Sequence, residues 1–277
     1  MRVLILGTSS GAGKTTICAM LCRYYSRMGY DPVPFKASNL SNTSVRTADG
    51  GEIGIGQAFQ AWSAGLEPER DMNPVILKPR GKGSVELYLY GEKRMQADLK
   101  NPIDKTTIMP EIGAALDRLA SKHGLVLAEG SGSPVELNTM PRDMANTGLM
   151  RETGIPAIIV GDIERGGVFA AIYGTWRLIP DDMKHQMKGF VINRFRGDAS
   201  ILRDGIKEIE RRTGMRCLGV LPRVDLRFPE EDSLSLKSGR MEGSTEHEAY
   251  MRNVDELVDV CIGAGFDFEG LLEIARE

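Results

Sequence analysis

GTSSGAGKTT, residues 7–16, follows directly on the apolar run RVLIL, which begins at the second residue. The apolar run predicts a short buried strand, and the periodic segment that starts at Lys14 predicts a helix. Gly11 and Gly13 allow the backbone between them to approach an anion closely, so that successive N–H groups and the helix N-terminus point at phosphate groups. The stretch therefore predicts a nucleotide-binding loop between a strand and a helix.

The spacing in this loop differs from the usual pattern Gly-x4-Gly-Lys-Thr, because Gly7 comes one residue early and Thr8 occupies the place of the first glycine. The Lys14 ammonium would reach the β- and γ-phosphates, and the Thr15 hydroxyl would bind Mg²⁺. The loop alone leaves open whether the nucleotide drives a switch, a phosphoryl transfer or the making of a new bond.

Composition excludes several classes of protein. The 277 residues carry a net charge of −3, which argues against a general nucleic-acid-binding protein, because such proteins usually carry a basic excess. No apolar run approaches the length that crosses a bilayer, and a strand that begins at residue 2 leaves no room for a signal peptide. We therefore expect a cytoplasmic protein without a membrane partner.

Short apolar segments alternate with amphipathic ones along most of the chain, which predicts an α/β fold of the P-loop NTPase type, a mostly parallel sheet with helices on both faces. The expected strands are residues 2–7, 30–37, 125–130, 157–162, 188–195 and 216–222, and the expected helices are residues 14–29, 52–65, 111–124 and 201–214. Gly124 is expected to be the C-cap of the third helix. Ligands of such folds bind at the carboxyl ends of the strands, so the residues after each strand are the candidates.

The character of the sequence changes near Asp225, where a polar segment rich in turn residues begins. We expect residues 1–225 to form the phosphate-loop domain, residues 226–248 a linker, and residues 249–277 a tail of one or two helices.

Lys36 follows the second expected strand, which should lie beside the first. A cation there could reach the γ-phosphate from the side opposite Lys14 and offset charge that develops during transfer, although an ordinary surface lysine explains the spacing equally well. Ser38 and Asn39 come next; they are turn formers that could also hydrogen-bond a polar substrate.

Acidic residues stand at two further positions. Asp49 and Glu52 bracket a glycine turn, and either could bind Mg²⁺ or could serve the turn and the start of a helix. Glu129 ends an apolar strand and enters the turn Gly-Ser-Gly-Ser, where an acidic residue is well placed to bind a metal in a phosphate-loop protein, and the glycines admit a bulky ligand near the backbone.

Two more strand ends carry polar groups. The segment GDIERGG places Arg165 before a glycine pair that opens a helix, an arrangement suited to a carboxylate. Asn193 follows the next strand, where its amide could read the edge of a nucleotide base, while Arg194 and Arg196 could bind carboxylates or be solvated.

Taken together, these motifs resemble the cobyric acid synthase family, which is similar to the dethiobiotin synthetases and the corrinoid a,c-diamide synthases. The stretches that carry the resemblance are GTSSGAGKTT, PFKASN, DGGEIG with QAFQAWSAG, MNPVILKP, EGSGSPVELN, RDMAN, GDIERGGVFAAIYGT, GFVINRFRGD, and GVLPRVD with PEEDS. They occur in the family's order and extend from Met1 to about Leu236.

The resemblance implies an enzyme that transfers the γ-phosphate of ATP to a side-chain carboxylate of a tetrapyrrole, giving an acyl phosphate from which ammonia displaces phosphate. In the family the substrate is adenosylcobyrinic acid a,c-diamide, and several peripheral carboxylates become carboxamides. The residues that we assign are Lys14, Lys36 and Glu129 for catalysis; Gly11, Ala12, Gly13, Lys14, Thr15, Thr16 and Asn193 for ATP; Thr15, Glu52 and Glu129 for Mg²⁺; and Ser38, Asn39, Ser131, Gly132, Arg165, Gly166 and Gly167 for the substrate.

The sequence departs from the family in two ways. Family members carry a glutaminase domain with a catalytic cysteine, and neither Cys261, in an expected helix, nor His247, in the expected linker, fits that pattern. We therefore expect the synthetase domain only, with ammonia taken free or from a separate glutaminase subunit, and a homodimer, as is common in related folds. The second departure is Ser38, which stands where the family has glutamine.

Two other functions stay open. One is a nucleotide-switched ATPase of the partitioning or metal-insertion type, which acts through a dimer and a protein partner; such proteins usually carry a glycine pair or a second lysine early in the loop, and GTSSGAGKT has neither. The other is a corrinoid-binding protein without activity, against which Lys14, Lys36 and Glu129 argue.

Overall fold

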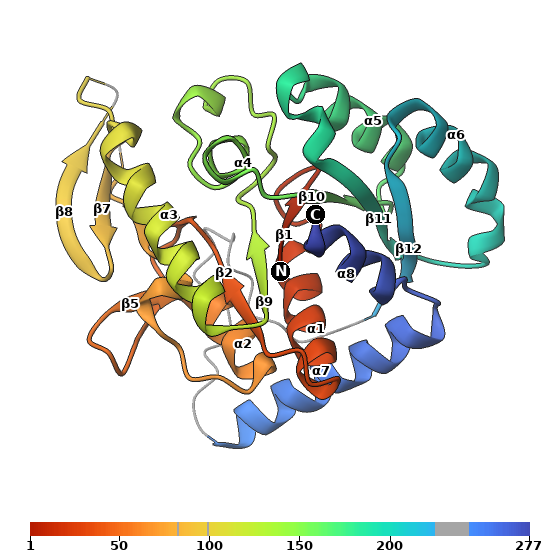
Figure 1. The fold of residues 1–277 in the computed structure, drawn as a ribbon, viewed down its shortest axis with the longest axis horizontal. Helices are drawn as coiled ribbons and strands as arrows, with labels where there is room; N and C mark the ends of the chain where they lie inside the picture. Colours follow the sequence, from red (N-terminus) through yellow and green to blue (C-terminus); the bar gives the residue numbers. More distant parts are fainter. Residues whose placement is uncertain (82, 99, 225–243) are drawn as a thin grey trace.

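The computed structural model describes residues 1–81, 83–98, 100–224 and 244–277, and its centre is a six-stranded parallel sheet (Figure 1). The strands lie in the order β12-β11-β10-β1-β9-β2, and each pairs in parallel with its neighbours. Their bounds are β1 Arg2–Gly7, β2 Pro32–Phe35, β9 Leu125–Glu129, β10 Ala157–Asp162, β11 Met187–Phe195 and β12 Arg216–Pro222. The predicted fold class, a mostly parallel sheet between helices, is confirmed.

Helices cover both faces of this sheet because alternate residues of its strands point to opposite sides. In β1, Val3 and Ile5 pack into one core cluster, and Leu4 and Leu6 pack into the other. The first face is covered by α1 Lys14–Arg27, α7 Ser244–Gly263 and α8 Phe268–Arg276, and the second by α3 Lys105–Lys122, α4 Thr147–Thr153, α5 Val168–Leu178 and α6 Arg203–Thr213. Helix α2, Ile55–Ala64, packs beside α1 and β2.

The expected neighbour of β2 is wrong. Strand β2 pairs with β9 rather than with β1, because β9 is inserted between them (Figure 1). A strand that enters between two earlier ones is fixed by long-range packing, which local sequence patterns do not encode. The insertion places Lys36, after β2, directly beside Glu129, at the end of β9.

A second, four-stranded sheet and a hairpin were not expected from the sequence. The sheet has the order β3-β6-β7-β8, with bounds β3 Ser38–Leu40, β6 Val75–Pro79, β7 Val85–Leu89 and β8 Glu92–Ala97, and the hairpin joins β4 Ser44–Arg46 to β5 Glu52–Gly54. The first three residues of the expected helix 52–65 therefore form β5, and α2 begins at Ile55. Short 3-10 turns connect other elements: η1 Arg70–Met72, η2 Met140–Arg142, η3 Asp181–Gln186 and η4 Ala199–Leu202.

Helix α3 is longer than expected and ends differently. It begins six residues before the expected start of 111, where the Asp104 carboxylate caps it by accepting from the Thr106 N–H at 3.0 Å, and Pro110 lies inside it. The expected C-cap Gly124 is wrong, because His123 already leaves the helix in an extended conformation. Gly124 instead lies so near the Tyr30 carbonyl that a Cβ would stand 2.6 Å from its oxygen.

The tail forms two helices, as expected, and both pack against the first face of the sheet. The Tyr25 hydroxyl of α1 donates to the Phe268 carbonyl at 2.7 Å, and the Arg23 guanidinium makes two hydrogen bonds to the Asp255 carboxylate. Of the expected linker, residues 226–243 lie outside the described residues, and residues 244–248 belong to α7. A search of the described helices finds none with the length and apolarity of a membrane span.

Candidate functional site

The loop between β1 and α1 has the backbone that its glycines predict. Gly11 and Gly13 have φ angles of 73° and 101°, in the region that side chains rarely adopt, and Gly13 is the N-cap of α1. A Cβ on Gly13 would stand 2.2 Å from the Asn193 amide nitrogen. That nitrogen donates to the Ala12 carbonyl at 3.0 Å, so Asn193 braces the loop, and its predicted contact with a base stays a prediction.

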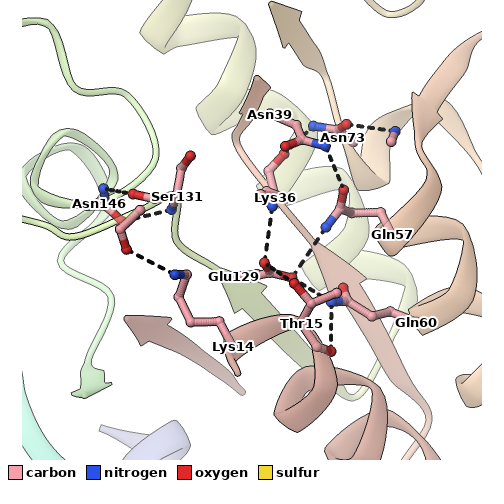
Figure 2. Close-up of polar contacts among 12 residues, drawn as sticks. Lys14, Thr15, Lys36, Asn39, Gln57, Gln60, Asn73, Glu129, Ser131 and Asn146 are labelled. Atoms are coloured by element: carbon pink, nitrogen blue, oxygen red, sulfur yellow. Dashed lines mark hydrogen bonds and ion pairs between the residues drawn. The ribbon is translucent and has the colours of Figure 1, made fainter. Parts of the chain in front are cut away.

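The Lys14 side chain is folded back over the loop and is only 5% exposed. Its ammonium donates to the carbonyls of Ser9 at 3.1 Å and Gly132 at 3.0 Å, so it joins the loop after β1 to the loop after β9. In Figure 2 the Lys14 ammonium points toward the segment that carries Ser131. Gly7 permits this position, because a Cβ there would touch the Lys14 side chain at 3.0 Å.

Glu129 is the centre of the site. Its side chain is 1% exposed, and four donors surround the carboxylate (Figure 2). Oε1 accepts from Lys36 Nζ at 3.0 Å and from the Thr15 hydroxyl at 2.8 Å, whereas Oε2 accepts from the amides of Gln60 at 2.5 Å and Gln57 at 3.4 Å. The structure thus brings together Thr15, Lys36 and Glu129, and their predicted roles toward ATP and Mg²⁺ stay predictions.

The environment keeps this carboxylate charged. Burial by itself disfavours the ionised form, but the ammonium groups of Lys36 and Lys14 and the hydrogen bonds from Gln60 and Thr15 outweigh it. The pKa of Glu129 is therefore held below its ordinary value. The ionised Glu129 carboxylate and the Thr15 hydroxyl beside it are therefore two oxygen groups that could bind a metal ion.

Two glutamines of this site, Gln57 and Gln60, were not predicted. Both are completely buried on α2, and Gln57 also accepts a hydrogen bond from the amide of Asn39 at 3.5 Å. Their only sequence signal is the spacing of three within QAFQAW, which puts both on one helix face, and glutamine in an apolar helix gives no chemical hint.

The loop after β9 is held by a side chain from the RDMAN motif. The Asn146 amide accepts from the Ser131 N–H at 2.9 Å and donates to the Ser131 carbonyl at 2.7 Å, as a neighbouring strand would (Figure 2). Asp143 accepts from the backbone N–H groups of Ala145 and Asn146 and from Gly148. This bracing fixes the Gly132 carbonyl to which Lys14 donates.

Other predicted residues lie apart from Glu129. The Glu52 carboxylate accepts from Lys78 at 2.7 Å and from the Ser44 hydroxyl, and it makes no hydrogen bond to Thr15 or Glu129 within the part of the chain that the structure describes. Burial opposes its ionisation, but these two donors lower its pKa. Ser38 and Asn39 are buried in β3, with exposures of 5% and 2%, so their predicted contact with substrate stays a prediction.

The segment around Arg165 lies at the same carboxyl edge of the sheet, after β10. Gly166 and Gly167 have φ angles of 77° and 73°, and Gly167 is the N-cap of α5. Nearby, Arg194 has a left-handed backbone with φ of 62° and donates to the Asp162 carboxylate at 2.8 Å. Arg165 itself is exposed, and its role toward a substrate stays a prediction.

The side-chain oxygens of Thr15, in the first turn of α1, and of Glu129, at the end of β9, fit Mg²⁺. Magnesium in proteins is usually bound by one or two carboxylates together with phosphate and water oxygens. Thr15 and Glu129 offer a hydroxyl and a charged carboxylate 2.8 Å apart. Among the described residues no group of three or more His, Cys, Asp or Glu side chains gathers into a metal site.

Comparison with known sequences places this arrangement in a family. Residues 3–235 match the family described as the CobQ/CobB/MinD/ParA nucleotide binding domain. The chain belongs to this family. Membership agrees with the phosphate-loop fold and with a nucleotide as ligand.

Curated relatives are named probable cobyric acid synthase, which confirms the predicted resemblance. The protein from Methanosarcina mazei is 48% identical over 235 residues, 84% of this chain and 48% of that protein. The protein from Methanosarcina acetivorans is 45% identical over 274 residues, 98% of this chain and 56% of that protein. The chain thus spans about half the length of the curated relatives it matches. Among solved structures, Cyanthece apo McdA aligns with a TM-score of 0.48 and 14% identity over 99% of this chain and 98% of that one.

Proposed function

We propose that this chain is an ATP-dependent carboxylate–amine ligase that amidates peripheral carboxylates of a corrinoid, of the type that converts adenosylcobyrinic acid a,c-diamide to cobyric acid. The observation that carries the chemistry is the buried ion pair of Lys36 and Glu129, joined by the half-buried Thr15 hydroxyl and close to the buried Lys14. The corrinoid substrate rests on the likeness to probable cobyric acid synthases.

In the proposed reaction, a carboxylate oxygen of the substrate attacks the γ-phosphorus of ATP, and ADP leaves. The resulting acyl phosphate is attacked by ammonia at its carbonyl carbon; the C–O bond to phosphate breaks, the nitrogen loses a proton, and a carboxamide and phosphate are released. Phosphoryl transfer depends mainly on positioning and on neutralising charge. Lys14 and Lys36 would supply two ammonium groups for this purpose.

Thr15 and Glu129 would hold Mg²⁺, which when bound would offset the negative charge of the β- and γ-phosphates. The pair's closeness supports this assignment, whereas Glu52 would need to leave Lys78 to join it. Asn193 would lie near the base, and the segments at Ser131 and Arg165 would line the substrate side.

Further parts of the proposal concern the setting of the reaction. Ammonia would come free or from a separate glutaminase, the enzyme would work in the cytoplasm, and a homodimer would be its assembly. Residues 1–225 would form the synthetase domain.

The test is to incubate the protein with ATP, Mg²⁺ and cobyrinic acid a,c-diamide, with ammonium or glutamine, and to measure ADP and the mass of the corrinoid. The proposal expects ADP release together with steps of one carboxyl-to-carboxamide exchange, with ammonium but not with glutamine alone. ATP turnover without a mass change on any tetrapyrrole polyacid would overturn the ligase and favour the switch ATPase. Binding without turnover would favour the inactive corrinoid-binding protein.

A further inference from the structure

The two oxygens of the Glu129 carboxylate are held by different parts of the molecule. Oε1 faces Thr15 and Lys36, which are the groups assigned to the metal and the phosphates. Among the described residues, Oε2 accepts hydrogen bonds from the two glutamine amides of α2, and the contact with Gln60, at 2.5 Å, is far shorter than the contact with Gln57, at 3.4 Å (Figure 2).

The orientation of the Gln60 amide is fixed by its neighbours. Its nitrogen lies between two acceptors, the Glu129 carboxylate and the Thr15 carbonyl at 3.4 Å, so the NH₂ group must face them. The amide oxygen then points elsewhere, and it is buried without a hydrogen-bond partner among the described residues. A buried acceptor without a partner is unfavourable, and an apolar side chain of the same size would avoid it. Packing alone therefore does not account for a glutamine at this position.

The chemistry expected at Oε1 explains why the Glu129 carboxylate needs a further hydrogen bond at Oε2. If ATP and Mg²⁺ bind as proposed, Lys36 turns to the phosphates and the Thr15 hydroxyl to the metal, so both leave the oxygen that they now contact. A carboxylate held only by those groups would be free to rotate at that moment. Gln60 comes from α2, outside the phosphate loop, so its contact can persist through the exchange.

We propose that Gln60 is a positioning residue: its amide holds Oε2 of Glu129 so that Oε1 stays turned to the metal and nucleotide while its other partners change. An amide suits this role because it is neutral. It orients the carboxylate and leaves intact the negative charge that a cation requires. A second lysine at this position would neutralise that charge. The inference rests on the proposed nucleotide chemistry but not on the corrinoid.

The test is the affinity for a non-hydrolysable ATP analogue, measured by calorimetry with EDTA and with excess Mg²⁺. In the wild type, Mg²⁺ should tighten binding. In Gln60→Met, the affinity in EDTA should stay close to that of the wild type, whereas the tightening by Mg²⁺ should fall about ten-fold or more, as for other groups that orient a metal ligand. Gln57→Met should lose less, because its contact is longer. Gln96→Met, on the exposed surface of β8, should change neither value.

A purely structural role of Gln60 would lower the affinity in EDTA and the affinity with Mg²⁺ by the same factor. If Mg²⁺ tightens binding to Gln60→Met as much as it does to the wild type, the inference is wrong. Gln60→Asn keeps the amide on a shorter side chain and should show the same selective loss. If circular dichroism finds both variants unfolded, Gln60 serves stability and the inference is wrong. A wild type that binds no nucleotide would instead count against the proposed function.

Discussion

Lys36 and Glu129 form an ion pair almost without solvent, since their side chains are 4% and 1% exposed. Burying two charges is costly, and their attraction offsets the cost only while both partners are present. The pair therefore contributes little to stability. It does keep a cation and a charged carboxylate close to the phosphate loop.

Lys36→Met should lower the free energy of unfolding by about 3–5 kcal/mol, because it leaves the buried Glu129 charge without its ion-pair partner. The double variant with Glu129→Gln should recover most of that loss while ATP turnover stays absent. Urea unfolding and ADP release measure the two quantities. A single variant as stable as the wild type, or a double variant that turns over ATP, would contradict the assigned role of this pair.

Gly13→Ala should be far more damaging than Gly11→Ala. Both residues have positive φ, so both alanines are strained, but only the Cβ at position 13 meets another atom, the Asn193 amide nitrogen at 2.2 Å. We expect Gly11→Ala to cost about 1–2 kcal/mol of stability, and Gly13→Ala to cost more and to release Asn193 from Ala12. Thermal unfolding and nucleotide binding compare the two; equal effects would mean that Asn193 does not brace the loop.

At the scale of elements, a side chain takes the place of a neighbouring strand beside the loop that follows β9. Asn146 satisfies both the N–H and the carbonyl of Ser131, and this fixes the next carbonyl, that of Gly132, for Lys14. The RDMAN motif thus contributes to the phosphate loop from a segment that lies after a different strand.

Asn146→Ala should weaken nucleotide binding and cost about 1–3 kcal/mol of stability, because the half-buried N–H and carbonyl of Ser131 lose two hydrogen bonds. Asn138→Ala is the matched control, since Asn138 lies exposed in the same connection. Chemical denaturation and calorimetry of the two variants provide the comparison. Equal behaviour of the two would show that the loop is held by other contacts.

The sequence predicted the parallel strands and most helices because their apolar periodicity is strong. It missed the strands of the second sheet; one of them, Ser38–Leu40, has only three residues and so carries no period of its own. It also missed Gln60, whose role depends on its side chain reaching from α2 to Glu129 at the end of β9, a relation that only the assembled fold contains. Thr15, Lys36 and Glu129 could be named as candidates because each stands at or just after the end of a strand or of the phosphate loop.

At the scale of the whole molecule, the C-terminal helices complete the core on which α1 rests. Leu271 and Leu272 of α8 are 1% and 2% exposed and pack in the same cluster as Ile17 and Cys18 of α1. The packing of α8 against α1 and the order of the strands both depend on partners that are distant in the chain. Local sequence patterns therefore could not predict either of them.

Leu271→Ala should lower the free energy of unfolding by about 2–5 kcal/mol, as for other buried leucines. Glu273→Ala, on the exposed side of α8, removes only a surface ion pair with Arg216 and should change it by less than about 1 kcal/mol. Urea unfolding followed by circular dichroism tests both. A small effect of Leu271→Ala would mean that α8 is dispensable for the core.

The hydrogen bond from Tyr25 to Phe268 spans 243 residues, and this separation has a consequence in time. At the usual rate of synthesis, about 5–20 residues per second, roughly 12–50 s pass between the appearance of the two partners. Throughout that interval the inner face of α1, with its buried cysteines, has no cover from α8. Until α8 has been synthesised, this face of the phosphate-loop unit therefore lacks that part of its core.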